Sequence, residues 1–266
     1  MIPLISSLQN PSIKNIQKLE KSSERKSQNK FVVEGAREIS IALNSNYQLV
    51  QLYFCPEIAD KSQSIYHKEI FDAAESLLTE ISFPVFEKLA YRENSDGLIA
   101  LFQQKSHAIQ FCELGNNPTL LILESIEKPG NLGAILRTAD AAGIDAVMIC
   151  DPKTDIYNPN VVRSSIGCVF SVQCIIATKE EVLNFCKQNN IKSFATTPSS
   201  SLNYTNVKMD MPCAIILGTE ADGLSDFWLN NADQKIKINM QGKIDSLNVA
   251  NCASIFTFEV LRQKNI

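Results

Sequence analysis

The sequence of 266 residues predicts an α/β protein built from two parts. From residue 119 onward, short apolar runs alternate with helical patterns, which is typical of a mostly parallel sheet with helices on both faces. In residues 1–105, short β-rich runs also alternate with helical patterns, and they indicate a small α/β sandwich. Residues 106–118 lose this periodicity and end in Gly-Asn-Asn-Pro, so we expect a linker there.

The N-terminal part is expected to contain short strands and two amphipathic helices. Apolar residues recur at helical spacing in 36–44 and 65–79. Apolar runs bounded by turn residues predict strands at 31–33, 49–55, 84–86 and 98–102.

The C-terminal part is expected to alternate more regularly. Its apolar runs predict strands at 120–123, 146–150, 171–175, 193–195, 214–217 and 236–238. Helices are expected at 131–142, 179–190 and 246–263. Because ligands of such sheets bind at the carboxyl ends of the strands, the loops that follow these strands are the candidate site.

The composition favours a folded protein without a membrane segment or a metal site. Hydrophobic content of 45% and charged content of 20% are ordinary for a globular chain. No apolar run approaches the roughly 20 residues of a membrane span, and the N-terminus lacks signal-peptide features, so we expect a cytoplasmic location. Eight cysteines without a Cys-x-x-Cys pair predict free thiols, and two isolated histidines offer no metal site.

Charge is distributed unevenly along the chain. The net charge of −4 is not that of a non-specific nucleic-acid binder. Six basic and two acidic side chains give residues 1–30 a charge of +4, so the rest of the chain sums to −8. This segment is either a local phosphate-contact surface or the solvated face of a helix. Its basic residues are Lys14, Lys18, Lys21, Arg25, Lys26 and Lys30.

Three segments that follow predicted strands contain residues suited to ligand binding. They are 130–139, 217–224 and 238–250. In the first, Asn131 is a good N-cap for a helix whose N-terminus can bind an anion, and Arg137 follows within two turns. In the second, Gly218 lets the backbone approach a ligand closely.

The third segment carries the most specific pattern. Ser246 can cap a helix that begins at Leu247, with Asn248 in its first turn. In this order and at these separations, the three segments resemble the three motifs of the SpoU/TrmH (SPOUT) family of RNA 2'-O-ribose methyltransferases. The matching residues of the third segment are Ile238, Met240, Gly242, Ser246, Leu247, Asn248 and Val249.

The resemblance extends over nearly the whole chain. Residues 31–37 and 97–100 resemble the substrate-binding domain that accompanies this family. The resemblance implies an L30e-like RNA-binding domain over 1–105 and an α/β-knot methyltransferase domain, mostly parallel with a trefoil knot, over 119–266. The family usually has glycine after the glutamate of the second motif, whereas here Ala221 follows Glu220, so that loop must be formed differently.

The resemblance further implies transfer of a methyl group from S-adenosylmethionine to a ribose 2'-hydroxyl. Arg137 resembles the family's catalytic arginine and Asn131 its partner at the acceptor ribose. Because a guanidinium ordinarily stays protonated, Arg137 is either an unusual base or a clamp on the adjacent phosphate. The other implied catalytic residues are Glu220, Ser246 and Asn248. The implied cofactor contacts are the backbone of Gly218, Ile238 and Leu247, with Leu217 and Met240 as apolar walls.

Family members form homodimers through the C-terminal domain, so the resemblance implies a homodimer in which Arg163 and Ser164 complete the partner's site. The expected substrate is structured RNA, with rRNA favoured over tRNA by the separate N-terminal domain. Two alternatives stay open, a non-catalytic RNA-binding protein with this fold and an RNA base methyltransferase. A nucleotide-dependent oxidoreductase is disfavoured, because its Gly-x-Gly-x-x-Gly pattern is missing.

Overall fold

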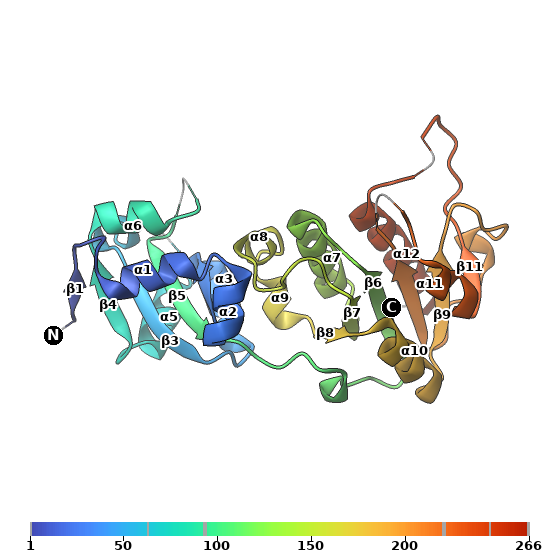
Figure 1. Cartoon of the computed structure of the whole chain (residues 1–266), viewed down its shortest axis with the longest axis horizontal. Coiled ribbons are helices and arrows are strands. Elements are labelled where there is room, and N and C mark those ends of the chain that lie inside the picture. The colour runs from blue at the N-terminus through green and yellow to red at the C-terminus, as the bar shows by residue number, and fades with distance from the viewer. Residues whose placement is uncertain (1, 63, 93–94, 220–221, 245, 265–266) are drawn as a thin grey trace. The chain divides into compact units, whose positions relative to one another are not determined.

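The computed structural model describes residues 2–62, 64–92, 95–219, 222–244 and 246–264. Its contacts divide the chain into two compact units (Figure 1). The N-terminal unit comprises Met1–Ser106 and Asp155–Ser171, and the C-terminal unit comprises His107–Thr154 and Val172–Ile266. Among the described residues, every helix falls short of the length and apolar character that a bilayer span requires.

The N-terminal unit is built on a mixed five-stranded sheet in the order β1-β4-β3-β5-β2. Strand β3 runs parallel to β4 and antiparallel to β5. The strands are β1 (Leu4–Ile5), β2 (Lys30–Glu34), β3 (Leu49–Phe54), β4 (Leu78–Ile81) and β5 (Leu98–Gln103). The helices before residue 106 are α1 (Pro11–Lys18), α2 (Ser22–Gln28), α3 (Ala36–Asn44), α4 (Pro56–Ala59), α5 (His67–Ala73) and α6 (Phe83–Leu89).

Two element predictions for this unit are wrong. The run at 84–86 lies in α6, where Pro84 occupies the first turn and the apolar side chains form one buried helical face. The helix predicted over 65–79 ends at Ala73, and Leu78 begins β4, which pairs with β3. Short apolar runs fit both periodicities, so contacts with the rest of the unit decide between them.

Residues 155–171 pack in the N-terminal unit, although the sequence assigned them to the C-terminal part. They form α8 (Pro159–Ser164) and α9 (Cys168–Ser171), so Arg163 and Ser164 lie in this unit. The chain therefore passes between the two units more than once, and the N-terminal unit is not a single stretch of sequence.

A buried ion pair and stacked aromatic rings hold this inserted segment. Arg25 is only 2% exposed, and its guanidinium lies 2.6 Å from the carboxylate of Asp155. The same guanidinium donates to the carbonyl of Leu19 at 2.8 Å. The ring of Tyr157 stacks on Phe31 with centroids 4.2 Å apart. One of the six basic residues of the N-terminal segment thus has a structural role.

The C-terminal unit has a six-stranded sheet in the order β11-β9-β10-β6-β7-β8, and all its described strand pairs are parallel. The strands are β6 (Thr119–Glu124), β7 (Ala146–Cys150), β8 (Cys174–Ala177), β9 (Lys192–Thr196), β10 (Cys213–Leu217) and β11 (Gln234–Ile236). The helices are η1 (Ile109–Phe111), α7 (Pro129–Ala141), α10 (Lys179–Gln188), η2 (Tyr204–Asn206), α11 (Asp226–Asn231) and α12 (Val249–Lys264). The predicted class, α/β with a mostly parallel sheet, is confirmed, whereas the knot and the L30e likeness stay predictions.

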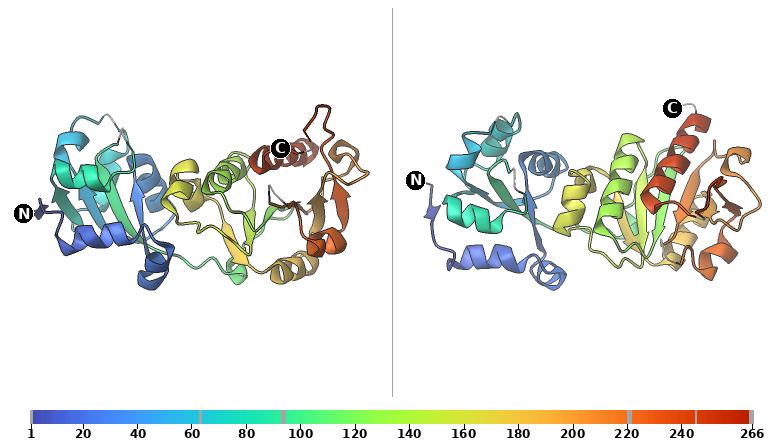
Figure 2. Two further views of the ribbon diagram at one scale, coloured as in Figure 1. Left: turned by 45° about the horizontal axis from the view of Figure 1, so that its top comes forward. Right: turned by 90° about the horizontal axis from the view of Figure 1, so that it is seen from above.

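Helices cover both faces of this sheet (Figure 2). Alternate strand residues such as Leu120 and Ile216 pack with Val182 of α10 and Trp228 of α11. On the other face α7 and α12 lie side by side, and the hydroxyls of Thr138 and Ser254 share a hydrogen bond of 2.9 Å. The segment predicted as a linker, 106–118, packs on this unit through apolar residues that include Ile109, Cys112 and Leu114.

The strand order reverses at β6. From β6 the chain proceeds outward to β7 and β8, then crosses to β9 and returns to β10, which lies directly beside β6. In open parallel sheets such a switch point leaves a crevice at the carboxyl ends of the strands. The first segment that the sequence singled out, 130–139, lies in α7, the helix after β6, and the other two begin at the carboxyl ends of β10 and β11.

Arg25→Ala is expected to destabilise the fold by about 3–5 kcal/mol, because it leaves the Asp155 carboxylate without its buried partner. Urea denaturation followed by circular dichroism measures this. Lys26→Ala, which removes an exposed charge from the same helix, should change the free energy of unfolding by no more than about 0.5 kcal/mol. Equal stability of the two variants would contradict the anchoring role of Arg25.

Candidate functional site

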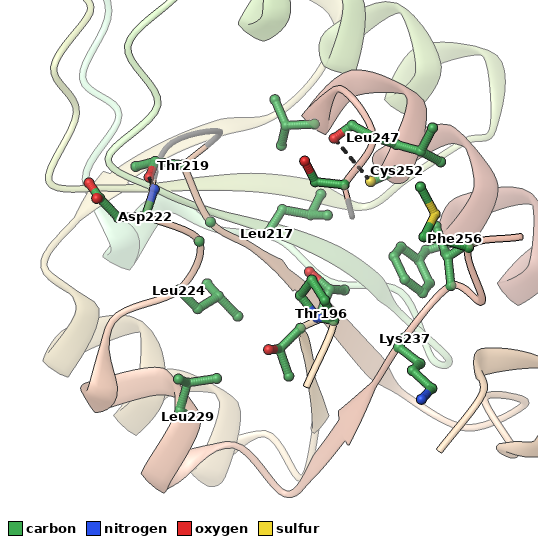
Figure 3. Close-up of a pocket in the computed structure, with 18 residues that line it drawn as sticks. Thr196, Leu217, Thr219, Asp222, Leu224, Leu229, Lys237, Leu247, Cys252 and Phe256 are labelled. Carbon is green, nitrogen blue, oxygen red and sulfur yellow. Dashed lines mark hydrogen bonds between the residues drawn. The ribbon is translucent and has the colours of Figure 1, made fainter. Parts of the chain in front are cut away.

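A cavity of about 460 Å³ lies at the carboxyl edge of the C-terminal sheet (Figure 3). Its size falls within the range of roughly 300–1,000 Å³ typical of small-molecule sites. Residues from the ends of β9 and β10, the loops after β10 and β11, and the first turns of α12 line it. Six predicted site residues are among them: Leu217, Gly218, Ile238, Met240, Ser246 and Leu247.

A tight turn after β10 forms one wall of the cavity. The N–H of Thr219 donates to the carbonyl of Gly223 at 3.0 Å, and the N–H of Gly223 donates back at 3.1 Å. A Cβ on Gly218 would lie 2.2 Å from the backbone of Gly223, so only glycine allows this turn to close. Gly218 is thus required for an approach of the chain to itself, and the expected close approach to a ligand stays a prediction.

A buried carboxylate ties this turn to the neighbouring strand. Glu124, at the end of β6, is 6% exposed and accepts hydrogen bonds from the backbone N–H of Ser225 at 2.8 Å and from its hydroxyl at 2.6 Å. Sequence reasoning missed this residue. The available signal was an acidic residue ending an otherwise apolar strand, where an ionised group needs donors.

The loop after β11 forms the opposite wall. Within the described residues, the backbone groups of Gly218, Ile238 and Met240 make no hydrogen bond, although these residues are only partly exposed. The carbonyl of Leu247 accepts a long contact of 3.8 Å from the thiol of Cys252 (Figure 3). Burial raises the pKa of the Cys252 thiol, which keeps it a neutral donor. Unpaired backbone groups beside apolar side chains suit a ligand with a flat apolar face and polar atoms at its edge.

The first and third segments meet through two asparagines. The amide nitrogen of Asn248 donates to the amide oxygen of Asn131 at 3.2 Å. The oxygen of Asn248 accepts from the N–H of Ala250 at 3.0 Å, so Asn248 caps α12 and the predicted cap at Ser246 is wrong. Asn131 does not cap α7 either, because that helix already begins at Pro129.

Arg137 does not line the cavity. It is exposed on α7, and its guanidinium forms no hydrogen bond or ion pair within the described residues. At about 100° per residue, Arg137 lies on a different side of α7 from Thr138, which faces α12. The predicted Glu220 lies outside the described residues.

Several lining residues were not predicted from the sequence. Among them are Thr196, Thr197, Asp222, Lys237, Cys252 and Phe256. Thr196, Thr197 and Asp222 follow predicted strands, which was the available signal. No metal-binding cluster of acidic, histidine or cysteine side chains occurs in the part of the chain that the structure describes.

A sequence profile of the SpoU rRNA Methylase family matches residues 118–258, and the MRM3-like substrate binding domain matches residues 10–100. The chain belongs to the SpoU rRNA Methylase family. The resemblance of the three segments is therefore confirmed at the level of the family.

Solved structures of the SpoU fold resemble the whole chain. An RNA 2'-O ribose methyltransferase shares 38% identity at a TM-score of 0.85, over 99% of this chain and 100% of that one. The AdoMet-bound rRNA methyltransferase from Sinorhizobium meliloti shares 25% identity at a TM-score of 0.89, over 98% of each chain.

Sequence relatives agree with this assignment. A putative TrmH family tRNA/rRNA methyltransferase of Staphylococcus aureus (strain COL) is 36% identical over 148 residues, which span 55% of this chain and 60% of the relative. The 23S rRNA (guanosine(2553)-2'-O)-methyltransferase RlmP of Bacillus subtilis is 25% identical over 96% of this chain and 98% of its own. The match thus spans less than two thirds of the first relative's length.

Glu124→Ala is expected to lower the free energy of unfolding by about 1–3 kcal/mol, because the Ser225 N–H loses its buried acceptor. Amide exchange in the turn after β10 should accelerate, which mass spectrometry detects. The matched control is Glu127→Ala, because Glu127 is 57% exposed and pairs with an exposed lysine, a contact worth about 0–1 kcal/mol. Unchanged exchange in Glu124→Ala would show that the turn does not depend on this carboxylate.

Proposed function

We propose that this chain is an S-adenosylmethionine-dependent RNA 2'-O-ribose methyltransferase. One observation carries the proposal: six residues predicted from two distant motifs surround a single cavity at the switch point of the sheet. Membership of the SpoU family and the names of its relatives support the same activity.

The cavity fits the nucleoside part of this cofactor. Leu217, Leu247 and Phe256 offer apolar surface for an adenine ring. The unpaired backbone groups of Gly218 and Ile238 offer donors and acceptors for the polar edges of base and ribose. When bound, the cofactor supplies a methyl group made electrophilic by a sulfonium.

The chain's own residues must position the acceptor ribose and manage its proton. The paired amides of Asn131 and Asn248 lie at the junction of α7 and α12, and they offer neutral hydrogen-bonding groups next to Leu247 of the cavity. Alignment of this kind can contribute several powers of ten in rate. Ser246 adds a hydroxyl at the cavity wall.

Arg137 is proposed to hold the RNA phosphate rather than to act as the base. Its guanidinium is exposed and without a partner in the described chain, and such a group binds phosphate in a bidentate manner. Since Arg137 lies away from the cavity of its own chain, we propose that it serves the cavity of a second copy in a homodimer. An exposed Phe258 on the neighbouring α12, 52% accessible, supports an interface there.

The proposed substrate is rRNA, with tRNA as second choice, because relatives over nearly the full length are named as rRNA enzymes. A cytoplasmic location is proposed with it, and the eight free cysteines fit a reducing compartment.

A non-catalytic RNA-binding protein is the alternative, favoured by the absence of Arg137 from the cavity lining. Incubation of the chain with labelled S-adenosylmethionine and total RNA from cells lacking the gene separates the possibilities. Label in a nuclease-resistant dinucleotide supports ribose methylation. Label in a free modified base would indicate a base methyltransferase, and cofactor binding without label transfer would indicate a non-catalytic protein.

Gly218→Ala is expected to weaken S-adenosylmethionine binding by about 10- to 100-fold, because the new Cβ collides with Gly223 and displaces a cavity wall. Isothermal titration calorimetry measures the affinity. Gly242→Ala is the matched control, since a Cβ there meets nothing within 4 Å. Equal affinities in the two variants would show that cofactor binding does not depend on the conformation of this turn.

Arg137→Lys is expected to lower kcat by about 100-fold while cofactor affinity is retained. The reason is that a lysine ammonium cannot reproduce the two parallel hydrogen bonds that the planar guanidinium makes to a phosphate. Full activity in that variant would refute the clamp. Mixing Arg137→Ala with Gly218→Ala subunits should restore activity, since the mixed dimer holds one intact cavity served by one intact arginine. No restoration from this mixture would place Arg137 in the site of its own chain.

A further inference from the structure

A second and much smaller pocket lies in the N-terminal unit, lined by residues of three elements. Glu34 comes from the end of β2, Tyr91 and Arg92 follow α6, and Arg163 comes from α8. None of these residues lines the cofactor cavity, although the family resemblance implies a role for Arg163 in the partner's site.

The floor of this pocket contains a carboxylate oxygen without a donor. Glu34 is 8% exposed, and its Oε2 accepts the backbone N–H of Tyr91 at 2.7 Å. Its Oε1 is buried and has no hydrogen-bond partner. Arg92 does not supply one, because its guanidinium pairs with Glu38. A buried ionised oxygen is unfavourable without a donor, so this pocket is suited to a ligand that brings an N–H group.

The rim of the pocket combines an aromatic ring with a cation. Tyr91 is 43% exposed. Burial and the neighbouring Glu20 carboxylate raise the pKa of its hydroxyl, so the ring stays neutral. Arg163 is exposed, and its guanidinium forms no hydrogen bond or ion pair within the described residues. The rim can therefore stack on a flat group and contact an anion beside it.

We propose that this pocket binds one unpaired nucleotide of the RNA substrate. Proteins read single-stranded RNA by stacking bases on aromatic rings and by hydrogen bonds to the base edges, while arginines contact the phosphates. The base stacks on Tyr91, an amino group at its edge reaches Glu34, and Arg163 contacts the phosphate. The pocket volume of about 20 Å³ has room for one group of the size of a water, so the base itself stays at the rim.

The surroundings of the pocket favour RNA. Glu20, which neighbours Tyr91, lies between the exposed Lys18 and Lys21 on the chain. With Arg25 buried against Asp155, the exposed positive charge of this segment comes from its lysines. Lysines there add sequence-independent attraction to phosphates on either side of the bound nucleotide.

The proposal rests on the proposed RNA substrate and is tested by binding of rRNA fragments to the full chain. Arg163→Ala and Tyr91→Ala should each raise the Kd for RNA by about tenfold, with unchanged affinity for S-adenosylmethionine as a check on folding. Arg163→Ala should also reduce the slope of log Kd against log salt concentration by about one, which corresponds to the loss of one phosphate contact. Tyr91→Phe keeps the ring and should bind as the wild type does. Lys68→Ala, which removes an exposed charge from α5, is the matched control.

Base preference provides a second measurement. Single-stranded oligocytidine should bind more tightly than oligouridine, because the cytosine amino group can donate to a carboxylate. Glu34→Gln should remove this preference, since an amide can place a donor where the amino group would lie.

The outcomes separate the two proposals. If the wild-type chain binds and methylates RNA, but Arg163→Ala and Tyr91→Ala bind as tightly as Lys68→Ala, the nucleotide pocket is overturned and the proposed function is retained. If the wild-type chain binds RNA through this pocket without methyl transfer, the proposed function alone falls. A wild-type chain that binds no RNA overturns both.

Discussion

The candidate site depends on the insertion of β10 between β9 and β6 in a parallel sheet. This order brings the loops after β6, β10 and β11 to one edge, although they lie far apart in the sequence. The Glu124 carboxylate fastens the end of β6 to Ser225, just after the turn that follows β10. A glycine at 218 then lets that turn fold against its own backbone. The cavity wall is thus fixed before any ligand is present, which is the preorganisation a binding site needs.

Sequence alone located the segments but not their local geometry. Apolar runs that alternate with helical patterns predict a parallel sheet and the ends of its strands. Because all three segments follow such strands, the sequence places them at the carboxyl edge of the sheet. The start of α12 was placed two residues early, since Ser246 and Asn248 are both good caps and only the contact with Asn131 distinguishes them. Asn131 resembles a cap by residue type, but Pro129 occupies the first turn of α7, so the helix begins before it.

Long-range contacts account for the features that sequence could not show. The pairing of Arg25 with Asp155 joins residues 130 positions apart, so it leaves no periodic trace, and it draws α8 and α9 into the N-terminal unit. The orientation of Arg137 on α7 also depends on long-range contacts. Its motif identified the residue, whereas its place relative to the cavity follows from how α7 packs on α12. The cofactor cavity and the pocket of the N-terminal unit also differ chemically, since the first combines apolar side chains with unpaired backbone groups and the second combines charged groups with an aromatic ring.

Backbone amide exchange with and without S-adenosylmethionine tests the central claim most directly, because it reports the cofactor's position without requiring the RNA. We expect protection confined to the turn after β10, the loop containing Ile238 and Met240, and the residues leading into α12. The helices of the opposite face, α10 and α11, should be unaffected. Protection elsewhere, or none at saturating cofactor, would contradict the assignment of this cavity.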